Sequence, residues 1–226
     1  MKRLLLIMVC AATLLGADLQ AATVAGKITF VTKRGQNPVR NETLIWLEPV
    51  GARPAKKAPA TFQLVTRNKS VAPHVLAIPA GSSVSFPNED PISHNLFSLS
   101  QNNQFDLGLY RKGAGKTQKF DAPGVVNVYC NVHPSMSAVI HVMTSPYYAF
   151  ADDAGNYSIT DIPAGKYNLI AWNEQGGISA PQPIEVSAAG AVSGNQAVTL
   201  DSTSYRQTQH LNKLGKPYLP PSDRDY

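Results

Sequence analysis

The 226-residue sequence has few cysteines, few charges and no apolar run long enough to span a membrane. Only 2 residues are cysteines, so a disulfide framework is excluded. Charged residues make up 15%, below the roughly 25% usual in soluble domains. Because 43% of the residues are hydrophobic, the chain is neither a disordered polyelectrolyte nor a coiled coil. The net charge of +5 is mild and the sequence contains no block of like charge, so we expect no nucleic-acid partner.

The beginning of the chain is typical of a secretory signal peptide. Lys2 and Arg3 precede an apolar run over residues 4–15, and small and polar residues follow as far as Ala22. The run is shorter than the roughly 20 residues that a membrane-spanning helix needs. We therefore expect residues 1–22 to be removed, leaving a periplasmic or otherwise exported protein with no membrane span.

The remaining sequence lacks sustained helical periodicity and has short alternating apolar runs instead. Turns rich in proline and glycine separate these runs, and the whole chain has 17 Pro and 16 Gly. β-Branched and aromatic residues dominate the runs, as is usual in strands. We therefore predict an all-β protein built of β-sandwiches. Strands are expected at residues 24–31, 43–47, 75–78, 83–86, 125–129, 138–142, 157–159 and 167–172.

Sulfur and imidazole side chains cluster at the end of one expected strand. If Cys10 leaves with the signal peptide, Cys130 remains as a lone thiol, which is a liability in an oxidising compartment unless it is buried or bonded. His133 and Met136 follow it at intervals of three residues. Two His with one Cys and a weak axial Met make up an electron-transfer copper site. His94, which follows another expected strand, is our candidate for the second imidazole.

At these positions the sequence resembles the cupredoxins, and most closely those of the amicyanin type. The resemblance covers residues 62–144 and implies a Greek-key β-sandwich that holds one type 1 copper ion per chain. It implies that Asn88 lies behind the ligands, forms a hydrogen bond near the cysteine ligand and ties the two ligand loops together. It also implies that one ring edge of His133 serves as the electron port. The matching residues are Phe86, Asn88, His94, Cys130, His133, Pro134 and Met136, and the implied ligands are His94, Cys130, His133 and Met136.

A second resemblance flanks the first. Residues 153–169, with a turn glycine, a Pro-x-Gly and a Tyr-x-Leu strand, resemble the second half of a carboxypeptidase regulatory, or transthyretin-like, domain. A matching first half lies at residues 26–47. The resemblance implies a small β-sandwich assembled from residues 23–55 and 145–201, with the cupredoxin domain inserted between them. Alternatively, the first segment belongs to the middle domain.

Other polar features are predicted to be structural. The basic stretch 110–120 is expected to be a solvated loop, and His141 to be a histidine on a strand face. His74 and His210 are expected to be solvated. The polar tail, residues 202–226, is expected to be extended or loosely packed, and we assign it no function.

Three functions fit these patterns. The first is an exported blue copper protein that transfers single electrons to and from a transient redox protein partner. Its partner would bind an apolar rim formed by Val132, Pro134, Pro91 and Ile92. The second is a periplasmic protein that binds and delivers copper with the same ligands, and the third is a β-sandwich binding module without metal. We do not expect an enzyme, because Met136 fills the position that a catalytic metal would leave open.

Overall fold

The computed structural model describes residues 21–51 and 56–218, so the expected signal peptide lies almost wholly outside the described residues. Within these ranges the protein is all-β, as predicted, and has a single 3-10 turn, η1 (Arg40–Glu42), as its helical element. All eight expected strands are present. No helix in this part of the chain is long and apolar enough to cross a membrane.

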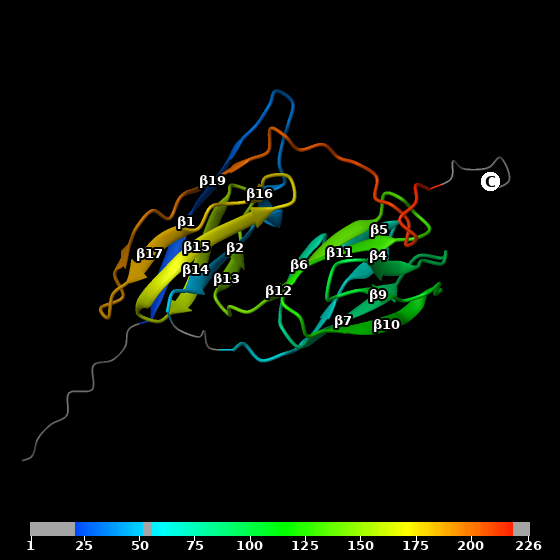
Figure 1. Cartoon of the computed structure of the whole chain (residues 1–226), viewed down its shortest axis with the longest axis horizontal. Helices are drawn as coiled ribbons and strands as arrows, with labels where there is room; N and C mark the ends of the chain where they lie inside the picture. Colours follow the sequence, from blue (N-terminus) through cyan, green and yellow to red (C-terminus); the bar gives the residue numbers. More distant parts are fainter. Residues whose placement is uncertain (1–20, 52–55, 219–226) are drawn as a thin grey trace, which may run out of the picture.

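The first β-sandwich combines β1 and β2 from the beginning of the described chain with the strands β13 to β19 from its second half (Figure 1). One sheet contains, in spatial order, β14 (Asn156–Ile162), β1 (Ala22–Val31) and β19 (Val198–Asp201). The other contains β13 (Tyr148–Phe150), β2 (Leu44–Pro49), β15 (Gly165–Asn173), β17 (Gln182–Val186) and β18 (Val192–Ser193), and β16 (Gly177–Ile178) pairs with β15.

The second β-sandwich is built from the chain between β2 and β13, and its sheets bring the predicted ligands together. One sheet contains β10 (Gly113–Phe120), β7 (Ser82–Asn88), β4 (Val65–Arg67) and β5 (Ser70–Ala72), and β3 (Thr61–Gln63) pairs with β7. The other contains β6 (Val75–Pro79), β12 (Ser137–Met143), β11 (Gly124–Cys130), β8 (Leu96–Ser98) and β9 (Phe105–Asp106).

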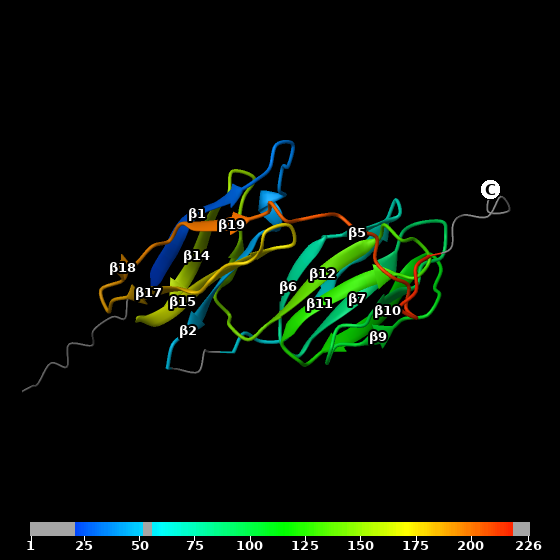
Figure 2. The same cartoon turned by 45° about the horizontal axis from the view of Figure 1, so that its top comes forward.

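The two sandwiches lie side by side and share an apolar interface (Figures 1 and 2). Side chains alternate between the two faces of a strand, so β2 sends Ile45 into the core of the first sandwich and Trp46 into the interface. In the same way β12 sends Ile140 into the core of the second sandwich and Met143 into the interface. His141 lies on this interface side of β12, against Trp46 and Trp172. Both faces of β12 are therefore buried, and His141 is 4% exposed.

Two segments differ from the sequence prediction. The basic stretch expected to be a loop is largely the strand β10, which pairs with β7 at the edge of a sheet. Its residues are mostly exposed and polar, as edge strands often are, which hides the alternation that marks a strand. After β19 the tail is extended, as expected, but it crosses to the second sandwich and makes specific hydrogen bonds there (Figure 2).

Candidate metal centre

The pairing of β8 with β11 brings the first histidine to the cysteine. Cys130 is the last residue of β11 and pairs with Leu96 at the start of β8. His94 lies two residues before Leu96 and forms an isolated bridge with Tyr110. His133 lies in the loop between β11 and β12. His94 and Cys130 are fully buried, whereas His133 is partly exposed.

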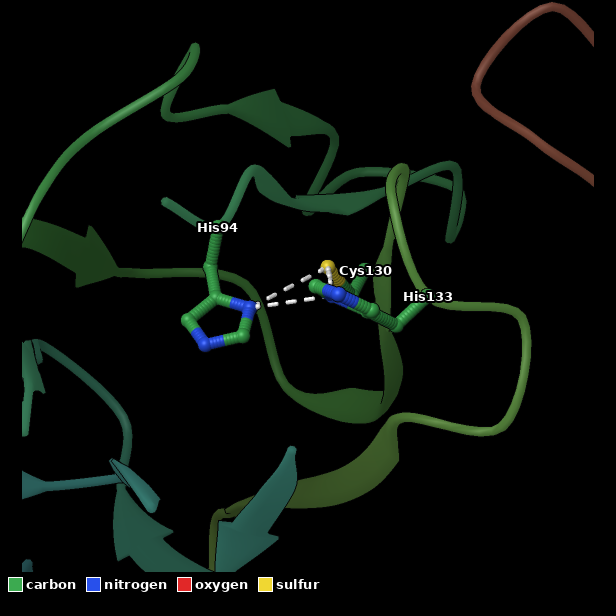
Figure 3. Close-up of side chains that lie close together, drawn as sticks. All are labelled: His94, Cys130 and His133. Atoms are coloured by element: carbon green, nitrogen blue, oxygen red, sulfur yellow. Dashed lines mark hydrogen bonds between the residues drawn. The ribbon is translucent and has the colours of Figure 1, made fainter. Parts of the chain in front are cut away.

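The side chains of His94, Cys130 and His133 converge on a common point (Figure 3). Cys130 Sγ lies 3.8 Å from His94 Nδ1 and 3.7 Å from His133 Nδ1, and the two Nδ1 atoms are 3.2 Å apart. A point equidistant from all three atoms lies about 2.1 Å from each, within the range of about 2.0–2.3 Å that nitrogen and sulfur ligands keep from a metal such as zinc. The three atoms are therefore spaced to ligate one metal ion.

A tight turn holds the loop between Cys130 and Met136. The backbone N–H of Met136 donates to His133 O at 3.1 Å, and the N–H of Cys130 donates to Met136 O at 3.1 Å. Met136 is 1% exposed and packs in the same core cluster as Cys130. The local sequence thus fixes the spacing of these three residues, and the role of Met136 as axial ligand stays a prediction.

Asp90 is a residue of the site that the sequence analysis did not assign. His94 Nε2 donates to Asp90 Oδ2 at 2.8 Å, so the hydrogen bond leaves the lone pair of Nδ1 free to face Cys130. Burial opposes ionisation of Asp90. The N–H groups of Lys69 and Asn68 and the His94 ring outweigh it, and the pKa of the Asp90 carboxyl lies below its usual range. A carboxylate close in sequence to a ligand histidine was the signal that could have identified it.

Asn88 lies on the His94 side of the centre. Its Oδ1 accepts hydrogen bonds from the N–H of Asp90 at 2.9 Å and from the Thr66 hydroxyl at 3.1 Å, and its Nδ2 donates to Ile92 O at 2.9 Å. The expected hydrogen bond near Cys130 is not among the bonds of Asn88 in the described chain. Asn88 instead orders the turn that carries Asp90, because the N–H of Asp90 and the carbonyl of Ile92 lie within hydrogen-bond distance of its side chain.

A backbone hydrogen bond ties the two ligand loops together in place of Asn88. The N–H of Asn131 donates to Asn95 O at 2.8 Å, which joins the residue after Cys130 to the residue after His94. The sequence could not identify this link, because any residue other than proline can supply a backbone donor.

The pKa of the His133 imidazole is lowered, first by burial and then by the neighbouring His94. A lowered pKa keeps the ring neutral near pH 7, which is the form that binds a metal. Beside it Val132 is 45% exposed, and on the His94 loop Ile92 is 37% exposed. The expected rim residues therefore include two exposed aliphatic side chains on the two ligand loops.

The other histidines lie outside the group of converging ligands. His74 Nε2 pairs with Glu174 Oε2 of the first sandwich at 2.6 Å, so the expectation that His74 is solvated is wrong. His210 is also not simply solvated, because its ring stacks on Tyr129 with centroids 4.4 Å apart. Both histidines meet residues distant in sequence, which a local pattern does not reveal.

Comparison with known proteins gives structural neighbours but no family assignment. No protein-family model and no curated protein matches this chain. Cupredoxins stand among the structural neighbours. They include a purple cupredoxin from Nitrosopumilus maritimus, 25% identical over 36% of this chain and 99% of its own, with a TM-score of 0.31. An oxidized amicyanin mutant is 15% identical over 36% of this chain and 81% of its own, with a TM-score of 0.35.

A copper-containing nitrite reductase from Thermus scotoductus is 24% identical over 51% of this chain but only 28% of its own length, with a TM-score of 0.35. All these TM-scores are below 0.5, so the neighbours do not define a function for this chain. The transthyretin-like identity of the first sandwich stays a prediction.

Proposed function

We propose that this chain is an exported type 1 copper protein that transfers single electrons. The observation that carries the proposal is the convergence of His94 Nδ1, His133 Nδ1 and Cys130 Sγ at mutual distances of 3.2–3.8 Å. Two imidazoles and a thiolate, with a thioether close by in the chain, are the donors that select copper among common metals. Copper bound there would supply a reversible change between Cu(I) and Cu(II).

The protein's own contribution is to hold the ligands still. His94 is fixed by Asp90, and Cys130 is fixed by the ladder of β11 and by its hydrogen bond to Met136. Because the ligands would keep the same positions in Cu(I) and Cu(II), the site would rearrange little when an electron arrives or leaves. His94 and Cys130 are fully buried, which leaves little room for a substrate beside them and disfavours a catalytic role, and we propose that the protein is not an enzyme.

His133 is the ligand candidate nearest to solvent, and we propose that electrons enter and leave there. Val132 and Ile92 would contact a transient redox protein partner. A contact built on a few exposed aliphatic groups buries little area, so the complex dissociates quickly. We also propose that the protein is exported to the periplasm, as residues 1–22 predict.

The proposal is tested by the visible and electron paramagnetic resonance spectra of the copper-loaded mature protein. We expect intense visible absorption from thiolate-to-Cu(II) charge transfer, lost in Cys130→Ala and kept in the control His74→Gln, which changes a histidine outside the centre. A colourless copper-loaded wild type would contradict the proposal.

Two further measurements separate the alternatives. Reversible one-electron cycling with a soluble cytochrome supports an electron carrier, whereas copper transfer to an acceptor without cycling supports copper delivery. A ligand that binds only the folded state must stabilise it, so copper should raise the melting temperature of the wild type. An unchanged melting temperature would favour a binding module without metal.

A further inference from the structure

The tail leaves the first sandwich after β19, and its last described residues, 210–218, lie against the metal centre of the second sandwich. Ser202, just after β19, is tied to the first sandwich by its N–H and its hydroxyl, which both donate to Val31 O. The chain then crosses to the second sandwich (Figure 2), where it contacts the end of β11 and the loop after it. Residues 202–218 are therefore anchored in both sandwiches, and the part that contacts the second sandwich is 210–218.

This segment contacts three consecutive residues around the cysteine. The His210 ring stacks on Tyr129, with centroids 4.4 Å apart and planes 18° apart. The Tyr218 hydroxyl donates to Cys130 O at 2.6 Å. The N–H of Lys213 donates to Asn131 Oδ1 at 3.0 Å. Together these contacts fix the residue before the thiol, its own carbonyl and the residue after it.

Lys213 is also linked, through Asp106, to the loop that carries His94. Its Nζ pairs with Asp106 Oδ2 at 2.6 Å, and Asn95 Nδ2 donates to Asp106 Oδ1 at 2.6 Å. Asn95 directly follows His94 in the chain. Burial opposes ionisation of Asp106, but Lys213, Asn95 and the N–H of Gly108 outweigh it and lower its pKa to about 2. The carboxylate thus stays charged and links the tail to the His94 loop.

We propose that residues 210–218 form a strap that positions both ligand loops, sets the reduction potential of the bound copper and slows its release. The inference rests on the proposed function. The Tyr218 hydroxyl draws electron density from the Cys130 carbonyl and turns its positive hydrogen toward the ligand residue. This favours the more electron-rich Cu(I) state, so the strap raises the potential.

The potential is tested with two matched tyrosine variants in the full mature chain. Tyr218→Phe removes the hydroxyl and keeps the ring, and we expect a lower reduction potential than in the wild type. Tyr205→Phe makes the same change in the tail, before the segment that contacts the ligand loops, and should leave the potential unchanged. Equal potentials in the wild type and Tyr218→Phe, or equal shifts in both variants, would overturn this part of the inference.

Positioning is tested by the rate at which copper passes to a chelator. The double variant Lys213→Met/Tyr218→Phe removes the two hydrogen bonds that these side chains make to Asp106 and Cys130. We expect copper release at least about 10-fold faster, the lower end of the effect usual for groups that orient ligands. The matched control Lys216→Met/Tyr205→Phe has the same composition and should release copper at the wild-type rate. Far-UV circular dichroism checks that both variants fold. Equal release rates in the two double variants would overturn the positioning role.

A readout without copper separates the strap from the proposed function. The backbone N–H of Asn131 donates to Asn95 O and is exposed when the two ligand loops open. Its hydrogen should therefore exchange with solvent faster in the metal-free Lys213→Met/Tyr218→Phe variant than in the metal-free Lys216→Met/Tyr205→Phe control. A wild type that binds no copper overturns the proposed function, and amide exchange then decides the positioning role alone. Equal exchange in the two variants would exclude a strap.

Discussion

Acid should destabilise this protein through one buried histidine at the interface between the sandwiches. His141 is 4% exposed, lies between Trp46 and Trp172, and has a buried Nε2 atom without a hydrogen-bond partner in the described chain. Burial alone lowers its pKa from 6.5 to about 4. Protonation would place a charge among apolar rings, so the folded state resists it.

The sign and size of the effect follow from proton linkage. Between pH 6.5 and 4 the unfolded chain binds a proton at His141 that the folded chain does not, so stability is full above pH 6.5 and falls as the pH drops. The shift corresponds to about 3 kcal/mol in total, of which about 2 kcal/mol is lost between pH 8 and pH 5. His74 acts in the opposite direction, because its hydrogen bond to Glu174 raises its pKa and stabilises the fold at low pH.

The assay is urea unfolding of the metal-free protein at pH 8 and pH 5, followed by tryptophan fluorescence. The chain has 2 tryptophans, and both flank His141, so the signal reports on the interface itself. His141→Phe keeps a ring and removes the titration, and its loss of stability on acidification should be about 2 kcal/mol smaller than that of the wild type. His74→Gln should show a larger loss than the wild type. Equal losses in the wild type and His141→Phe would refute the reasoning.

Two further predictions concern the site and the sheet that supports it. Asp90→Asn should weaken copper binding about 10- to 100-fold in competition with a chelator, because His94 loses its charged acceptor, and an unchanged affinity would contradict this role. Gly115→Ala should lower the free energy of unfolding by more than about 2 kcal/mol, since φ is +72° and the new Cβ would lie 1.8 Å from Phe86 O. Gly113→Ala, with φ at +146° and open space around it, is the matched control, and an equal loss in the two variants would exclude the clash.

Part of the fold could be predicted from the sequence because its signals are local. The eight expected strands have alternating or wholly apolar runs, which bury one or both faces whatever their partners are. The short strands and the polar edge strand β10 were missed, because exposed residues carry no such alternation. Which strands pair, and that two sandwiches pack through β2, β12 and β15, depends on contacts between distant segments.

The candidate site divides in the same way. The spacing of Cys130, His133 and Met136 was determined by the sequence alone, because backbone hydrogen bonds close their loop within seven residues. His94 was a candidate from the sequence, but only the tertiary structure decided that it lies beside Cys130, because the pairing of β8 with β11 brings it there. The contact of Tyr218 with Cys130 spans 88 residues and comes from an irregular tail. A single hydrogen bond of this kind leaves no periodic trace in the sequence, so only the folded chain reveals it.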